Sequence, residues 1–188
     1  MDQNRYIVCY PGGGITDMLS VIGLCLDYAI KHKRTLLIDT TYKTSWFKHD
    51  IFEYVDFTHA SIYSKHPRDF YPSFQTKSVY PQLMKDNFDN LEHIYKNKAY
   101  HMLGTEKSLA TNLSSHYKED IVVYSNCGTS KSTSYLNLIL STMQFKNTVL
   151  TPFLKNYLKL PENYISIHIR NTDIKSNTDE FLRANSFS

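Results

Sequence analysis

The sequence predicts an α/β fold, a Rossmann-like domain in which helices pack against a parallel β-sheet. The first observation is a strand, a glycine-rich loop, a helix and a second strand in succession between residues 5 and 39. Two neighbouring strands that run in the same direction need such a crossover, which is almost always right-handed. The second observation is an apolar run at residues 121–125, which supplies a third strand. With 188 residues, of which 41% are hydrophobic, the chain is long enough to bury one core.

Each element of the first unit follows from its residues. Residues 5–10 are an apolar run of β-forming residues before Pro11, which predicts a buried strand that enters a turn. Apolar residues then recur at helical spacing between positions 15 and 30, with Thr16 placed to cap the helix and Asp17 in its first turn. The basic residues 31–34 are interpreted as the helix end, where cations favour the negative pole of the dipole. Residues 35–39 are predicted to form the second strand.

The rest of the chain is less regular. Residues 40–119 are rich in aromatic and polar side chains and contain several prolines, so we expect loops and short helices there. Helices are expected at 135–145 and 152–160, and a last strand at 164–169. We therefore expect an α/β domain over residues 1–155 and the start of a second domain over residues 156–188, with the last strand peripheral to the main sheet.

Composition and spacing exclude several classes of protein. The net charge of +3, from 21 basic and 18 acidic residues, is too weak to indicate a nucleic-acid or membrane-surface partner. Neither the three cysteines nor the eight histidines show metal-ligand spacing, and no Asp-x-Asp pair occurs, so no metal site and no disulfide framework are predicted. The N-terminus lacks a signal-peptide pattern, and the most apolar stretch is interrupted by Asp17 and Asp27. We expect a cytoplasmic protein.

The first candidate binding motif is the loop of Gly12, Gly13 and Gly14 between the first strand and its helix. Glycines allow a ligand to approach the backbone, and the free N–H groups of a helix N-terminus attract anions such as a diphosphate. A tight turn that needs positive φ is the equally simple alternative. The loop is not a Walker motif, and Asp17 stands where Gly-x-Gly-x-x-Gly would have its third glycine. Asp39 after the second strand resembles the ribose-binding acid of a dinucleotide fold, so a dinucleotide-binding oxidoreductase is one hypothesis.

The second candidate motif is residues 168–173, at the end of the last expected strand. His168 and Arg170 alternate with isoleucines, so both polar side chains are predicted to lie on one face. Ligands of parallel sheets bind outside the carboxyl ends of strands, and an arginine there can hold a phosphate through two parallel hydrogen bonds. An ion pair between Arg170 and Asp173 is the structural alternative.

Taken in order, the two motifs resemble the fucosyltransferase superfamily, and within it the nodulation-type and core α1,6-fucosyltransferases. Those proteins begin with a Gly-rich loop, a helix and a strand that reads Arg-Thr-Leu-x-Ile-Asp, which is matched here by residues 12–19 and 27–39. Their second signature, His-x-Arg-x-x-Asp, is similar to residues 168–173.

The resemblance implies the N-terminal half of a GT-B glycosyltransferase. It implies inverting, metal-independent transfer of fucose or a related sugar from a GDP-sugar, commonly GDP-fucose, to a glycan acceptor, with no cofactor besides the donor substrate. Arg170 would bind the diphosphate, with Gly12, Gly13 and Gly14 near the same phosphates, and Asp173 would act as a base or orienting group. We add His168 to this phosphate site, because it shares a face with Arg170.

Two departures from the family pattern shape the expectation for this chain. Core fucosyltransferases have a second arginine where Asn171 stands, and their second signature opens a nucleotide-binding domain, whereas this sequence ends at Ser188. We therefore expect weak donor binding and no transfer unless a separate C-terminal half completes the site. A non-catalytic protein that binds a glycan or a partner chain is the third hypothesis. The Lys-, Asn- and Tyr-rich composition is typical of an AT-rich source such as a large DNA virus.

Overall fold

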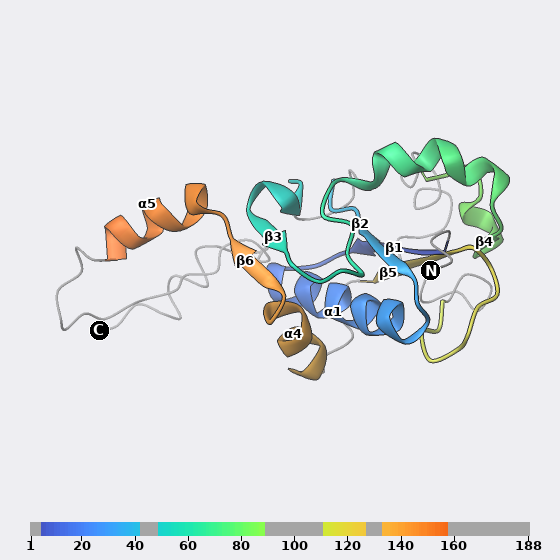
Figure 1. Ribbon diagram of the computed structural model, residues 1–188, viewed down its shortest axis with the longest axis horizontal. Coiled ribbons are helices and arrows are strands. Elements are labelled where there is room, and N and C mark those ends of the chain that lie inside the picture. Colours follow the sequence, from blue (N-terminus) through green and yellow to red (C-terminus); the bar gives the residue numbers. More distant parts are fainter. Residues whose placement is uncertain (1–4, 42–48, 89–110, 127–132, 158–188) are drawn as a thin grey trace, which may run out of the picture. The chain divides into compact units, whose positions relative to one another are not determined.

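The computed structural model describes residues 5–41, 49–88, 111–126 and 133–157. It divides into two units, Met1–Leu150 and Thr151–Ser188, and the first holds nearly all of the described elements (Figure 1). In chain order these are β1 (Tyr6–Pro11), α1 (Ile15–Lys31), β2 (Thr35–Ile38), the 3-10 helix η1 (Ile51–Glu53), β3 (Val55–Phe57), the 3-10 helix η2 (Pro67–Thr76), β4 (Val79–Tyr80), the 3-10 helix η3 (Gln82–Met84), β5 (Ile121–Asn126), α4 (Thr133–Leu140), β6 (Met143–Phe145) and α5 (Asn147–Tyr157).

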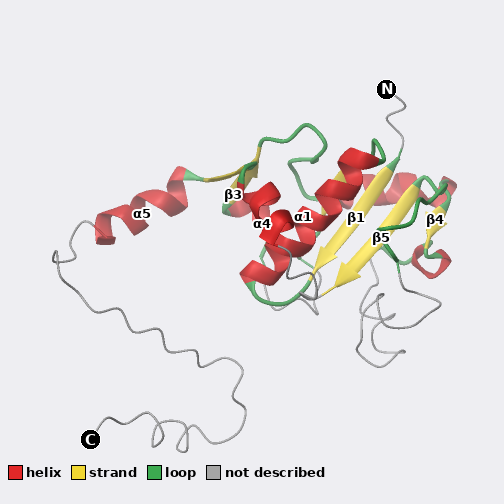
Figure 2. Cartoon of the chain, turned by 90° about the horizontal axis from the view of Figure 1, so that it is seen from below, coloured by secondary structure: helices red, strands yellow, loops and turns green. Residues whose placement is uncertain are grey.

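The main sheet is parallel, as predicted, and has the strand order β2-β1-β5-β4. Figure 2 shows β1 and β5 side by side, with Tyr6 in register with Ile121 and Pro11 with Asn126. All six residues of β1 are buried, as expected for the central strand of a parallel sheet that is covered on both faces. The three strands predicted from apolar runs are therefore confirmed.

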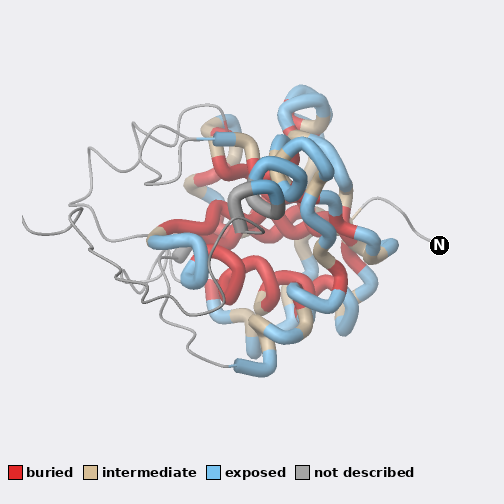
Figure 3. The backbone as a smooth tube through the Cα atoms, turned by 90° about the vertical axis from the view of Figure 1, so that its left-hand side faces the viewer, coloured by how far each residue is buried: buried red, intermediate tan, exposed pale blue. Residues whose placement is uncertain are grey.

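Two apolar layers cover the sheet. On one face, α1 and α4 pack over Ile7, Cys9 and Tyr124, and on the other face η2 packs over Val8, Tyr10 and Val123. Successive residues of a strand point to opposite faces, which explains why neighbours in β1 belong to different layers. Buried residues are concentrated in the strands and in α1 (Figure 3). Within the described ranges, no helix is both long and apolar enough to cross a bilayer.

Several expected elements differ in the structure. Gly14, not Thr16, is the N-cap of α1, and it offers no side-chain cap. The helix expected at 135–145 ends at Leu140, where the hydroxyls of Ser141 and Thr142 donate to the carbonyls of Leu138 and Ile139, and the chain then forms β6. A side-chain hydroxyl that takes a carbonyl of the last turn competes with continuation of the helix.

The remaining differences lie in the poorly periodic regions. β6 pairs with β3 in a separate two-stranded antiparallel sheet, and neither strand was predicted. The short strand β4 lies in the region expected to hold only loops and short helices, which the structure otherwise fills with η1, η2 and η3. The helix expected at 152–160 begins earlier, at Asn147. The strand expected at 164–169 lies outside the described residues.

Arg34 lies inside the protein and beyond the end of α1, whereas the sequence interpretation assigned it to the helix end. Its side chain is 3% exposed, and helix α1 already ends at Lys31. Its guanidinium nitrogens donate to four backbone carbonyls, those of Tyr6, Tyr117, Glu119 and Asp120, at 2.6–3.3 Å. These carbonyls lie at the start of β1 and just before β5, so one side chain links the amino ends of both strands to the residue that precedes β2.

We predict that Arg34→Lys destabilises the protein by about 3 kcal/mol, because a lysine ammonium keeps the charge but cannot reach four carbonyls in a planar arrangement. Urea unfolding measures this loss, and Lys33→Met is the control, because Lys33 is an exposed neighbour. Equal stability of Arg34→Lys and the wild type would show that charge alone matters at this position.

A second prediction concerns Gly23 of α1, where an added Cβ would overlap the backbone carbonyl of Tyr135 in α4. In an isolated helix, alanine is favoured over glycine by about 1 kcal/mol. Because α4 must move away from the new methyl group, we expect Gly23→Ala to destabilise the protein by about 1–3 kcal/mol in urea unfolding. A stabilised variant would contradict the close contact of α1 with α4.

Candidate functional site

The carboxyl edge of the sheet, where β1, β2 and β5 end, is the candidate site. From β1 the chain passes through α1 to β2 on one side, whereas β5 lies on the other side of β1. Ligands of open parallel sheets bind at such a switch point, outside the carboxyl ends of the strands. Because Pro11 is in register with Asn126, the glycine loop after β1 begins level with the end of β5.

The three glycines form the connection between β1 and α1. Gly13 has a φ of 90°, a backbone conformation that residues with a side chain rarely adopt. Gly14 has an extended backbone at the helix N-cap. The first intrahelical bond runs from the Met18 N–H to the Gly14 carbonyl. The N–H groups of residues 15–17 therefore have no acceptor within the helix, which leaves donors at this end. The local geometry agrees with both interpretations of the loop, a tight turn and an anion site.

Asp17 limits what this loop can bind. One carboxylate oxygen of Asp17 lies 3.0 Å from the position that a Cβ of Gly13 would occupy, and the side chain is exposed. A negative charge beside the helix N-terminus opposes a diphosphate at the same point, whereas a carboxylate is a hydrogen-bond acceptor for neutral donors such as hydroxyl groups. The loop with Asp17 is therefore better suited to a neutral polar group than to an anion that lies directly over Gly13.

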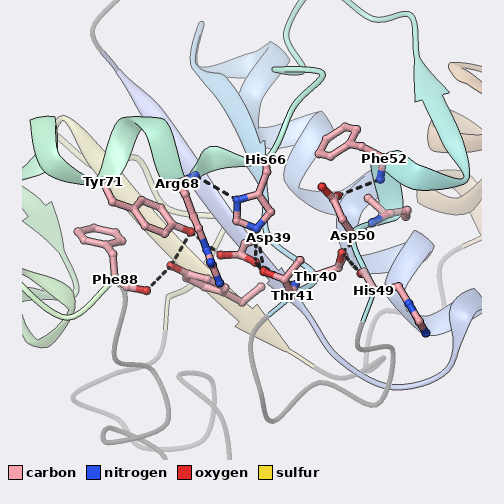
Figure 4. A network of polar contacts seen from close by, with 12 residues as sticks. Asp39, Thr40, Thr41, His49, Asp50, Phe52, His66, Arg68, Tyr71 and Phe88 are labelled. Carbon is pink, nitrogen blue, oxygen red and sulfur yellow. Dashed lines mark hydrogen bonds and ion pairs between the residues drawn. The ribbon is translucent and has the colours of Figure 1, made fainter.

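Asp39, directly after β2, is the centre of a buried polar network (Figure 4). Its side chain accepts hydrogen bonds from the backbone N–H and hydroxyl of Thr41, both at 2.9 Å, and from the Tyr71 hydroxyl at 2.6 Å. The Nε2 atom of His66 lies 3.3 Å from the same carboxylate. Burial alone would raise the pKa of Asp39, but hydrogen bonds from His66, Tyr71 and Thr41 outweigh it, so this pKa lies below its usual value.

His66 orients the start of η2 through both ring nitrogens. Its Nδ1 accepts the backbone N–H of Arg68 at 3.2 Å, and its Nε2 lies 2.7 Å from the Thr41 hydroxyl. With Nδ1 as an acceptor, Nε2 carries the ring proton, which the Thr41 hydroxyl oxygen at 2.7 Å and the Asp39 carboxylate at 3.3 Å share. Because both nitrogens are engaged, His66 fixes structure here and is not a free general base.

Tyr71 and Tyr10 extend the network to β1. The Tyr10 hydroxyl lies 3.1 Å from that of Tyr71, to which it donates, and 3.4 Å from the carbonyl of Phe88. Burial, the nearby Tyr10 and the negative charge of Asp39 raise the pKa of Tyr71 well above its usual value, so its hydroxyl stays protonated as a donor. The network thereby holds η2 against the carboxyl ends of β1 and β2.

The structure brings only part of the predicted site together. Gly12, Gly13 and Gly14 lie at the carboxyl edge, whereas His168, Arg170 and Asp173 lie outside the described residues. Sequence reasoning missed Tyr10, His66 and Tyr71. The one available signal was Tyr10, since a phenol inside a fully buried strand needs a hydrogen-bond partner. Within the described ranges, no group of three or more His, Cys, Asp or Glu side chains could hold a metal.

We predict that Tyr71→Phe destabilises the protein by about 1.5–3 kcal/mol at pH 7, because it removes a hydrogen bond to a buried carboxylate. The pKa of Asp39 is lower in the folded chain than its reference of 3.8, so its stabilisation is present above that value and is lost as the pH falls through the native pKa. The difference in the free energy of unfolding between Tyr71→Phe and the wild type should therefore become smaller as the pH falls.

Urea unfolding at pH 7 and at a series of pH values below 3.8 tests this dependence, because the carboxylate of Asp39 is ionised at pH 7 and is protonated as the pH falls through its lowered pKa. The control is Tyr63→Phe, in a residue that packs on the same aromatic cluster. If the difference in unfolding free energy between Tyr71→Phe and the wild type did not change with pH, an ionised Asp39 could not be the acceptor of the Tyr71 hydrogen bond.

The fold resembles crystal structures of fucosyltransferases. The structure of fucosyltransferase NodZ from Bradyrhizobium matches with a TM-score of 0.52 and 13% sequence identity, over 84% of this chain and 56% of that chain. NodZ α1,6-fucosyltransferase soaked with GDP-fucose matches with a TM-score of 0.53 and 14% identity, and the form co-crystallized with GDP with 0.52 and 14%, over the same shares. No protein-family model and no curated protein matches the sequence.

These matches confirm, at the level of the fold, the resemblance inferred from the sequence. At 13–14% identity the similarity establishes architecture, and the chain spans 56% of the length of the fucosyltransferases that it matches. The mixed α/β fold with a parallel sheet is that of a GT-B glycosyltransferase over this part.

Proposed function

We propose that this chain belongs to a glycosyltransferase that transfers fucose or a related sugar from a GDP-sugar to a glycan, with inversion and without a metal ion. The observation that carries the proposal is the match of the parallel sheet and its crossover to a fucosyltransferase fold. The neighbours that were soaked with GDP-fucose or crystallized with GDP support a nucleotide-sugar donor.

Within this proposal the two motifs have separate roles. Arg170 and His168 bind the diphosphate, and the guanidinium of Arg170 stabilises the charge that grows on the leaving GDP. Asp173 orients the reacting groups or takes the proton of the acceptor hydroxyl. Gly12, Gly13 and Gly14 lie near the same phosphates but at the margin of the site, because the carboxylate of Asp17 opposes an anion directly over Gly13.

The network around Asp39 argues against the oxidoreductase hypothesis. In that hypothesis a free carboxylate after the second strand would accept hydrogen bonds from ribose hydroxyls. Here Asp39 is 4% exposed, and its oxygens already accept bonds from Thr41 and Tyr71 beside His66. A carboxylate has about four lone-pair sites, so little capacity is left for a ribose.

Donor binding tests the proposal. We expect GDP-fucose to bind more tightly than NAD in calorimetric titrations of the chain, and GDP to compete with it. Arg170→Ala should weaken GDP-fucose binding by about a hundredfold, the loss typical of one preorganised donor to a charged group, while the Tm changes little. Arg170→Lys should recover little of this loss, because a point charge cannot reproduce a two-bond contact.

Arg183→Ala is the matched control, since it removes an arginine of the same C-terminal region outside the motif. Tighter binding of NAD than of GDP-fucose would favour the oxidoreductase hypothesis over the glycosyltransferase. GDP-fucose binding that Arg170→Ala leaves untouched would remove the site assignment. Binding of a glycan without any binding of GDP-fucose would favour the non-catalytic protein of the third hypothesis.

A further inference from the structure

A cavity of about 350 Å³ lies on the α1 face of the sheet, away from the carboxyl edge. It lies between the second half of α1, residues 111–114, Tyr124 of β5 and Tyr135 of α4. Helix α1 rises by about 1.5 Å per residue, so Asp27 on the cavity wall is about 20 Å along the helix from Gly14. The cavity is therefore separate from the glycine loop at the carboxyl edge, and its volume lies within the range of small-ligand pockets.

The wall contributed by α1 carries one charge of each sign. Asp27 and Lys31 are four residues apart on the same face of the helix, both are exposed, and both line the cavity. In the part of the chain that the structure describes, neither has an ion-pair partner within 4 Å. The cavity thus offers a strong acceptor and a strong donor whose charges cancel, which favours a neutral ligand over an anion or a cation.

The opposite wall is held rigid and presents further polar groups. The side-chain oxygen of Asn112 accepts hydrogen bonds from the backbone N–H and hydroxyl of Ser114, at 3.0 and 2.6 Å, and the Asn112 N–H donates to the Tyr117 hydroxyl at 2.8 Å. With the oxygen of Asn112 engaged, its amide nitrogen has no acceptor within the described ranges. The wall therefore adds a donor whose position is fixed.

Aromatic side chains complete the lining. Tyr28 and Tyr124 are buried and Tyr135 is half-buried, and all three line the cavity. The Tyr135 hydroxyl has no hydrogen-bond partner among the described residues, so it can both donate and accept. Aromatic rings supply an apolar contact surface, and the polar groups around them supply directional bonds.

We propose that this cavity binds a single neutral sugar unit of a glycan, at a subsite distinct from the carboxyl edge. A pyranose carries hydroxyls that each donate and accept, together with apolar C–H faces. The hydroxyls match the polar groups of the cavity, and the C–H faces match its tyrosine rings. The polar groups are the carboxylate of Asp27, the ammonium of Lys31, the amide of Asn112 and the phenol of Tyr135. A phosphate or carboxylate would meet Asp27, and a cation would meet Lys31. The inference does not depend on the donor assignment, since a glycan-binding chain without transferase activity would use the same cavity.

Saturation-transfer NMR with methyl glycosides of common neutral hexoses and of N-acetylglucosamine tests the proposal. We expect saturable binding of at least one glycoside in the millimolar range, and no saturation with glycerol, which has hydroxyls but no ring. Asp27→Asn and Tyr135→Phe, which keep the shape of the cavity, should each weaken binding by about fivefold, the typical effect of one hydrogen bond.

Asp69→Asn is the matched control, because Asp69 is an exposed residue of η2 that does not line the cavity. Thermal melts establish that each variant is folded. The absence of saturable glycoside binding up to tens of millimolar overturns the proposal, and so does binding that both cavity variants leave unchanged.

GDP-fucose titrated into the same samples separates this proposal from the proposed function. The cavity variants should bind GDP-fucose as the wild type does, and Arg170→Ala should bind the glycoside as the wild type does. Loss of glycoside binding in Arg170→Ala would place the sugar at the donor site and overturn the separate subsite.

Discussion

The buried guanidinium of Arg34 is the contact on which the arrangement of the central strands depends. A parallel sheet brings the amino ends of its strands together, and at that edge Arg34 donates to the carbonyls of Tyr6, Glu119 and Asp120. Unpaired carbonyls there would each carry a desolvation cost. One planar cation with five N–H groups can satisfy several of them at once, which no neutral side chain can do. The order β2-β1-β5 and its register follow from this shared anchor and from the apolar strands around it.

At each edge of the sheet, a charged side chain forms hydrogen bonds with polar groups around it, and the two charges are of opposite sign. At the amino edge a cation is surrounded by carbonyls, and at the carboxyl edge the carboxylate of Asp39 is surrounded by donors from Thr41 and Tyr71. Because the carboxylate of Asp39 already accepts hydrogen bonds from Thr41 and Tyr71, the network at the carboxyl edge has a structural role and does not bind a ligand. In the described part of this edge, the glycine loop and the exposed carboxylate of Asp17 remain available to a ligand.

The parts of the fold that were predictable from the sequence are those in which local pattern and tertiary environment agree. β1, β2 and β5 are apolar runs buried on both faces, and α1 has a long apolar stripe, so periodicity identified them. Arg34 was assigned to the helix end because a cation there favours the negative pole of the dipole, whereas its carbonyl partners lie 28 residues before it and more than 80 residues after it. Tyr10 and Tyr71 are 61 residues apart, so their hydrogen bond has no local signature. The two-residue strand β4 is defined by its pairing with β5 alone.

The pairing of β1 with β5 has a consequence for biosynthesis. Tyr6 emerges from the ribosome long before Ile121, its partner in the sheet. At translation rates of about 5–20 residues per second, the interval is on the order of ten seconds. Throughout it, one edge of a wholly apolar strand has no native neighbour, and β2 can cover only the other edge. An unpaired apolar edge is a template for association with other nascent chains, so this protein is exposed to such association from the synthesis of β1 until β5 is made.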